Sequence, residues 1–88
     1  MQLLNVTCPR GVWTQVYGGA NTATIGISPG YGYVCQSDAQ PANGLIGFPI
    51  INRHQEVLAY VATPGSPVWV KALDGNATNG DAIAIVNA

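Results

Sequence analysis

Glycine or proline interrupts this chain about every ten residues, a spacing that leaves no room for a helix of ordinary length. The runs between them are rich in Val, Ile, Thr, Tyr and Trp, which suit the pleated surface of a β-sheet. Short strands that recur every 8–12 residues between turn signals are typical of sandwiches and barrels. We therefore predict an all-β fold, a small antiparallel β-sandwich or β-barrel of seven to eight short strands. The expected strands cover residues 3–7, 13–17, 23–27, 31–36, 45–50, 57–62, 68–73 and 82–86.

The length of the chain sets the size of its core. A chain of 88 residues forms one domain at most, and folding removes only about 60–65% of the surface that its unfolded form exposes. We expect a single β domain over residues 1–88, with a short N-terminal arm over about residues 1–11. A core this thin favours stabilisation by a partner subunit or a covalent link.

Charged residues make up only 8% of the chain, and the net charge is −1. The average soluble domain has about 25%. The three cations, Arg10, Arg53 and Lys71, are too few for a phosphate-binding patch, so we expect no nucleic-acid partner. Interface cores are depleted in charge, so this composition fits an assembled protein. A small neutral domain with a surface of Asn, Gln, Thr and Ser is the alternative.

The chain also lacks the sequence signals of membrane insertion and secretion. No apolar run approaches the ~20 residues of a membrane-spanning helix. The start, MQLLNVTCPRG, has neither the basic residues nor the long apolar stretch of a signal peptide. We therefore expect synthesis in the cytoplasm and no membrane partner.

Two stretches have a similar layout at an offset of 36 residues, YGYVCQSDAQPANG at 31–44 and the segment at 67–80. Val34 matches Val70, and Tyr33 falls on Trp69. Both stretches also end in Asn-Gly, and in each an aspartate lies five residues before that asparagine. One interpretation is two similar strand–loop–strand units packed face to face, which would build a small sandwich. Chance, or turn chemistry that both loops share, is the other.

Candidate catalytic and metal-binding groups are few. The one histidine, His54, lies in the polar stretch NRHQE between Arg53 and Glu56, and a solvated loop accounts for it. The stretch at 74–81, DGNATNGD, has the oxygen ligands of a calcium loop, but the twelfth position, where an EF-hand needs glutamate, is Ile85. We therefore predict no catalytic residue, no metal and no cofactor.

The two cysteines, Cys8 and Cys35, lie in apolar, strand-like segments. In a cytoplasmic protein, reduced thiols that act as small buried hydrophobes are expected. A disulfide is the alternative, and a metal-binding or catalytic role is a third option.

The two tryptophans and four tyrosines all lie in expected strands. We expect Trp13 and Trp69 in the core, with the side chain of Trp69 turned inward and those of Val68 and Val70 turned outward. Some tyrosines must then lie near the surface, either in a protein interface or as a platform on which sugars stack. Because charge is scarce, we favour the protein interface. The six residues are Trp13, Tyr17, Tyr31, Tyr33, Tyr60 and Trp69.

Three stretches, GFPI at 47–50, YVATPGSPVWVKA at 60–72 and the closing apolar run, resemble in style the small, neutral, all-β virion proteins of tailed bacteriophages. The resemblance covers roughly residues 30–86. It implies a structural protein of the virion, of the kind that decorates capsids as a cement protein or sits in tails and fibres. It supplies no catalytic residues.

These inferences combine into one functional prediction. We expect a non-enzymatic capsid decoration protein that stabilises a phage head on the virion surface, binding the major capsid protein or another virion protein as a homo-oligomer, with a trimer favoured. The alternative is a glycan- or receptor-binding module of a tail or fibre. The expected partner contacts are Arg10, Tyr31, Arg53, His54 and Glu56.

Overall fold

A computed structural model describes residues 3–28, 30–53, 56–74 and 82–88. Within these ranges the chain forms strands and turns, without a helix. The expected all-β class is therefore confirmed. The described strands are β1 (Leu3–Cys8), β2 (Trp13–Tyr17), β3 (Ala23–Ser28), β4 (Gly30–Gln36), β5 (Phe48–Arg53), β6 (Glu56–Leu58), β7 (Tyr60–Ala62), β8 (Val68–Asp74) and β9 (Ala82–Asn87).

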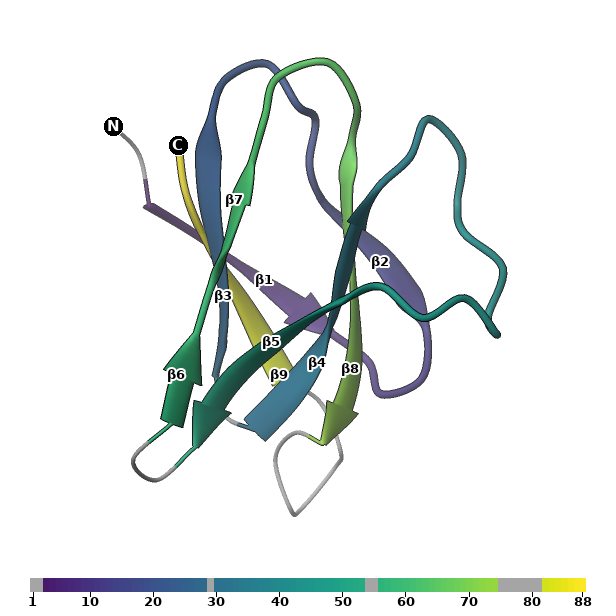
Figure 1. Ribbon diagram of the computed structural model, residues 1–88, viewed down its shortest axis with the longest axis vertical. Helices are drawn as coiled ribbons and strands as arrows, with labels where there is room; N and C mark the ends of the chain where they lie inside the picture. The colour runs from purple at the N-terminus through teal and green to yellow at the C-terminus, as the bar shows by residue number, and fades with distance from the viewer. Residues whose placement is uncertain (1–2, 29, 54–55, 75–81) are drawn as a thin grey trace.

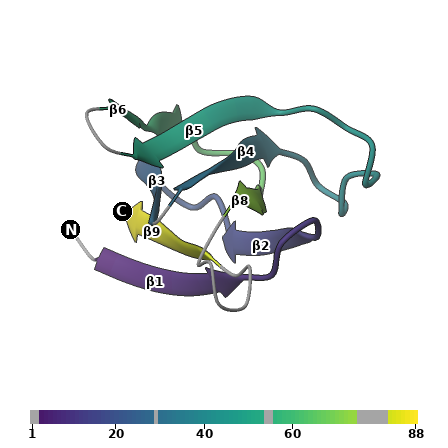
Figure 2. The same cartoon turned by 90° about the horizontal axis from the view of Figure 1, so that it is seen from below.

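The strands form two antiparallel sheets (Figures 1 and 2). The four-stranded sheet has the order β1-β9-β3-β7, and the five-stranded sheet has the order β2-β8-β4-β5-β6. Each sheet ends in edge strands, so the fold is a sandwich of two open sheets and not a closed barrel.

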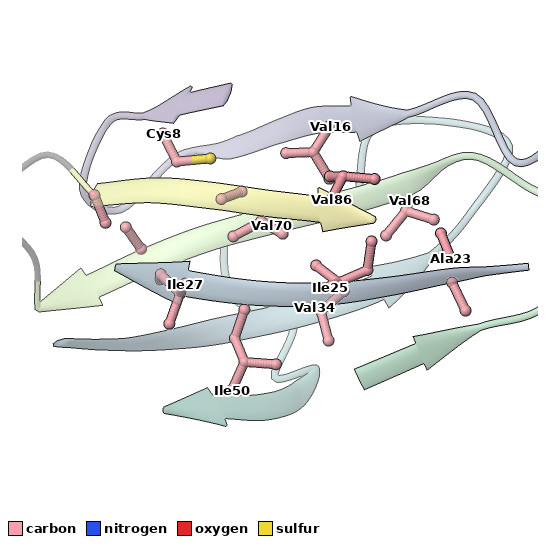
Figure 3. Close-up of a cluster of buried hydrophobic side chains, with 14 residues drawn as sticks. Cys8, Val16, Ala23, Ile25, Ile27, Val34, Ile50, Val68, Val70 and Val86 are labelled. Atoms are coloured by element: carbon pink, nitrogen blue, oxygen red, sulfur yellow. The ribbon is translucent and has the colours of Figure 1, made fainter. Parts of the chain in front are cut away.

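The core lies between the sheets and is built mainly from alternate residues of the strands other than β6 (Figure 3). Strand β3 shows the pattern, because Ala23, Ile25 and Ile27 are buried while the residues between them are exposed or half-buried. Side chains alternate across a strand, so period-two hydrophobicity gives one face to the core. The buried cluster consists of Cys8, Val16, Ala23, Ile25, Ile27, Val34, Ile50, Ala62, Val68, Val70, Ala72, Ala82, Ala84 and Val86.

The segment expected as one strand over 57–62 is divided between the two sheets. Its first part, β6, pairs with β5, and its second part, β7, pairs with β3. Ala59 lies at the switch. This division explains why the described part of the chain has nine strands where seven to eight were expected.

The strand expected over 45–50 is displaced toward the C-terminus and runs from Phe48 to Arg53. Pro49 lies within it, opposite Tyr33 of β4. Proline is tolerated here because β6 pairs only with Ile51–Arg53, so the other side of β5 at Pro49 lacks a strand neighbour. The residues before Phe48 belong to a loop.

The expected orientation of Trp69 is wrong. Val68 and Val70 are fully buried between the sheets, and Trp69 points to the outer face of the five-stranded sheet, where it is half-buried. Both faces of this part of β8 are apolar, so alternation could not identify the inner one. On the outer face, the indole Nε1 of Trp69 donates to the carbonyl of Ser37 at 2.8 Å.

The two similar stretches are not units packed face to face. Their strands, β4 and β8, are hydrogen-bonded neighbours in one sheet, and Val34 lies directly opposite Val70. The next strand after each stretch lies in a different sheet: β5, which follows β4, belongs to the five-stranded sheet, and β9, which follows β8, belongs to the four-stranded sheet.

The first strand is part of the sandwich. Residues 3–8, expected within a short N-terminal arm, pair with β9 along their whole length. After Pro9 the chain crosses to the other sheet, where Arg10 bridges to Ala72 and the amide of Gly11 donates to the Ala72 carbonyl at 2.8 Å.

Candidate interaction surfaces

The loop between β4 and β5, residues 37–47, lies against the outer face of the five-stranded sheet, and we call it the covering loop. It extends beside β2 on the right of Figure 1. Trp13 of β2 lies under it with only 1% of its surface exposed. The indole Nε1 donates to the Ala42 carbonyl at 3.1 Å, and the Gln40 side-chain amide donates to the Trp13 carbonyl at 2.9 Å. Trp13 is thus buried as expected, but outside the central core cluster.

Lys71 is buried beside Trp13, with 8% of its surface exposed. Its Nζ donates to the Asn43 carbonyl of the covering loop and lies 5.4 Å from the centroid of the Trp13 ring. The carbonyl dipole and the face of the indole both stabilise a cation. One of the three cations of the chain thereby holds the covering loop, and its charge is withdrawn from the surface.

The covering loop approaches the sheet most closely at Gly47. A Cβ atom there would lie 2.5 Å from the Val34 carbonyl oxygen and 3.1 Å from the Trp13 ring. Any larger residue would push the loop away from the sheet. Gly47 therefore fixes the position of the apolar residues on either side of it.

Three large apolar side chains flank Gly47 and are substantially exposed. We call Leu45, Ile46 and Phe48 the apolar tip; Ile46 is 73% exposed and the other two are close to half exposed. The Phe48 ring contacts Tyr60 of β7, with a centroid separation of 5.3 Å. The tip is thus an apolar surface on a backbone that Trp13 and Lys71 anchor. Its exposure was not foreseen, because apolar residues are expected inside.

A second apolar surface is an open groove where the chain switches from β6 to β7. Its volume is about 290 Å³. The side chain of Val57, which is 77% exposed, forms part of the groove wall. Gly26 of β3 also lines the groove, and a Cβ atom at this position would meet no other atom within 4 Å. The polar side chains among the described residues that line the groove are the amides of Asn52 and Asn87 and the hydroxyl of Thr24. The lining is Leu3, Thr24, Gly26, Ile27, Ile51, Asn52, Val57, Leu58, Ala59, Ile85 and Asn87.

Four of the five predicted contact residues lie in the described part of the chain. Tyr31 is half-buried on β4 opposite Ile51, and two residues further along β5 the backbone of Arg53 pairs with Glu56. These three positions share one end of the sheet. Arg10 is exposed and bridges to β8, so β8 and β4 lie between it and β5. His54 lies outside the described residues.

Among the described titratable groups, the two cysteine thiols have clearly shifted pKa values. Cys8 is buried and Cys35 half-buried; both thiols are free. Burial raises the pKa of the Cys8 thiol from 9.0 to about 11, so it stays protonated at neutral pH. Burial also raises the pKa of Cys35. Among the described residues, no group of three or more His, Cys, Asp or Glu could hold a metal ion. The stretch 75–81, which includes most of the loop that resembles a calcium site, lies outside them.

A search of the described strands and turns finds no helix that is long and apolar enough to cross a membrane. Comparison of the chain with protein-family models, curated proteins and solved structures gives no match. The arguments for function therefore come from this chain alone.

Proposed function

We propose that this chain is a non-enzymatic structural protein of a virion and that it decorates a preformed capsid by binding the major capsid protein. The observation that carries the proposal is the exposure of large apolar side chains on a charge-poor surface. In the described part of the chain, nine such side chains are at least 38% exposed. Exposed apolar groups in number mark sites of protein contact, and sparse charge is typical of interface cores.

The apolar tip is the proposed contact with the capsid. Leu45, Ile46 and Phe48 stand on a backbone that the buried Trp13 and Lys71 hold against the sheet. A contact held in place before binding loses little conformational entropy when it binds. Each tip would bind weakly, and repetition over the lattice would supply avidity.

The exposed charges lie outside the apolar tip and would belong to the outer rim of a wider contact. Arg10 is exposed beyond β1, and Glu56 is exposed at the start of β6. Rim charges of this kind change the association rate and the salt dependence more than the affinity. Raising the ionic strength should therefore slow decoration of the capsid with little effect on saturation.

The groove gives little support to the alternative, a glycan-binding module. Sugar-binding sites use an exposed aromatic ring as a stacking platform, and the described residues that line the groove include no aromatic side chain. Phe48, the most exposed aromatic side chain among the described residues, packs on Tyr60. We therefore retain protein binding as the proposed function.

Binding of the purified protein to undecorated capsids tests the proposal. Saturable binding at a fixed ratio per capsomer is expected. Ile46→Asp should weaken it about tenfold or more, because it places a charge in the centre of an apolar contact. Val57→Asp is the matched control: Val57 is similarly exposed, at 77%, and lies on β6, which pairs with the other end of β5 from Phe48. Failure of the unaltered protein to bind capsids, with density for this chain in the tail, would favour the alternative. Equal losses from both variants would reject the tip as the contact.

A further inference from the structure

The two sheets have four edge strands, β1 and β7 in one and β2 and β6 in the other. Exposed strand edges can pair with other chains, and proteins protect them by short length, charge or a bulge. Three of the four edges are protected in this way. Strands β6 and β7 have three residues each, and β6 carries the exposed Glu56. Strand β2 has a register shift between Gln15 and Tyr17.

Strand β1 has none of these protections. It is six residues long, LLNVTC, with no charge, proline or glycine. Its pairing with β9 runs from Leu3 to Cys8 without a register shift. Figure 2 shows β1 at the outer margin of the four-stranded sheet. A long, regular and uncharged edge is the kind that accepts another strand.

The side chains of β1 are also incompletely covered. Leu4 and Val6 point toward the core but remain half-buried, although they pack against the buried cluster. Leu3, on the other face, is 65% exposed. A further strand beside β1 would cover the two inward side chains and extend the core.

We propose that β1 pairs with β1 of a second copy of this chain, antiparallel about a two-fold axis, to form a continuous eight-stranded sheet. Residues directly opposite in an antiparallel pair point to the same face. A register centred on Asn5 satisfies this rule, because it places Leu4 opposite the second copy's Val6 and Leu3 opposite its Thr7. Each half-buried inward residue then gains an apolar neighbour, and the pairing is identical for both copies.

The second copy fits this edge because the strand is self-complementary. A symmetric pair places the central residue beside its own counterpart, where like charges would repel. Strand β1 contains no charge, so this repulsion is absent. The six-residue edge is only about 20 Å long. It is therefore smaller than a standard stable interface of ~800 Å² per partner, and we expect a reversible dimer with a micromolar dissociation constant.

This dimer differs from the trimer expected from the sequence, and it does not depend on the capsid. Sedimentation of the purified full-length chain over a range of concentrations tests it directly. A reversible monomer–dimer equilibrium is expected. A monomer at all concentrations, or a trimer, would overturn the pairing. Capsid binding is measured separately, so a failed dimer would leave the proposed function standing.

A matched pair of variants then identifies the edge. Asn5→Lys places two like charges together at the two-fold axis and should weaken the dimer at least tenfold. Gln15→Lys makes the same kind of change on the other long edge, β2, and should leave dimerisation unaltered. Asn5 and Gln15 are both exposed, so both variants should keep the unaltered melting temperature. Equal dimerisation by the two variants would exclude the β1 edge.

Engineered cysteines test the register. In a Cys35→Ser background, Asn5→Cys should form an intermolecular disulfide under mild oxidation, because the two Cα atoms lie about 4.5–5.5 Å apart in such a pair. The two copies of Thr7 would be displaced by four residues, about 13 Å along the strands, so Thr7→Cys should not cross-link. Cross-linking of Thr7→Cys, or of neither variant, would contradict the register centred on Asn5.

Discussion

Replacement of Trp13 by alanine should destabilise the protein more than replacement of Trp69. Trp13 is 1% exposed beneath the covering loop, whereas Trp69 is half-buried on the same outer face. A tryptophan buries about 200 Å², and at about 25 cal/mol per Å² this burial is worth about 5 kcal/mol. Because the loop can settle partly into the space, we expect Trp13→Ala to cost about 3–5 kcal/mol.

The corresponding loss for Trp69→Ala is smaller, about 2–3 kcal/mol, because Trp69 is only partly buried and some of its surface is already in water. It includes one hydrogen bond, from the indole to the Ser37 carbonyl. A domain of this size has a stability of only about 4–13 kcal/mol. Trp13→Ala could therefore unfold the protein outright, and Trp13→Phe provides a milder variant. It keeps most of the packing, loses the hydrogen bond to Ala42, and should cost about 1–2 kcal/mol.

Urea denaturation followed by far-ultraviolet circular dichroism measures all three variants, because this signal does not depend on the replaced tryptophan. The expected order of stability is Trp13→Phe, then Trp69→Ala, then Trp13→Ala as the least stable. A Trp69→Ala protein that is as unstable as Trp13→Ala would refute the reasoning. It would mean that the covering loop leaves Trp13 open to solvent and that Trp69 carries the packing.

Three further predictions concern single sites. Lys71→Met, which keeps the buried stem and removes the charge, should change the stability in urea by less than about 1 kcal/mol, because desolvating an ammonium offsets its contacts; a loss above 3 kcal/mol would contradict this. The stability should fall as the pH rises from 9.0 to about 11, because the unfolded thiol of Cys8 ionises while the folded thiol, with its raised pKa, stays protonated. When the melting temperature is plotted against pH, Cys8→Ala should flatten the curve over this range. An unchanged slope would show that Cys8 does not cause the loss of stability. Gly19→Ala should lower the melting temperature by several degrees, since Gly19 has φ 87° and a Cβ would lie 2.3 Å from the Ser66 carbonyl oxygen. Gly18→Ala, with open space around it, should have little effect, and equal shifts would contradict the account.

The sequence predicts the strands well where one face alone is apolar. In β3 the alternation of Ala23, Ile25 and Ile27 with smaller or polar residues identifies both the strand and its inner face. The period of two is a local property, so it can be read without knowing which strands are neighbours. The turns at Gly and Pro are local in the same sense.

The sequence fails where the answer depends on distant parts of the chain. Residues 56–62 have no local signal at Ala59, and the division into β6 and β7 arises because β5 and β3 belong to different sheets. The orientation of Trp69 is ambiguous because both faces of β8 are apolar. Its outer face becomes suitable for an indole only when residues 37–47 fold over the sheet. No window around Trp69 contains that information.

The candidate surface was missed for a related physical reason. Chemical site residues can be recognised by type, and the search for them led to His54 and the charges near it. A contact surface consists of ordinary apolar residues, such as Leu45 and Ile46, which differ from core residues only in their final exposure. Exposure depends on the whole fold, so neither residue carries a recognisable signal of its own.

The scarcity of charge connects the covering loop with the proposed interfaces. In a sandwich with a charged outer surface, each sheet has one apolar face, and solvent covers the other. Here the outer faces also carry large apolar groups, such as Trp13 and Ile83, and these need a cover or remain exposed. The chain covers Trp13 itself, with residues 37–47, and uses Lys71 to fasten that cover. Within residues 3–28, 30–53, 56–74 and 82–88 no segment covers the apolar tip or the β1 edge. These uncovered surfaces are therefore the ones to which a partner would be expected to bind.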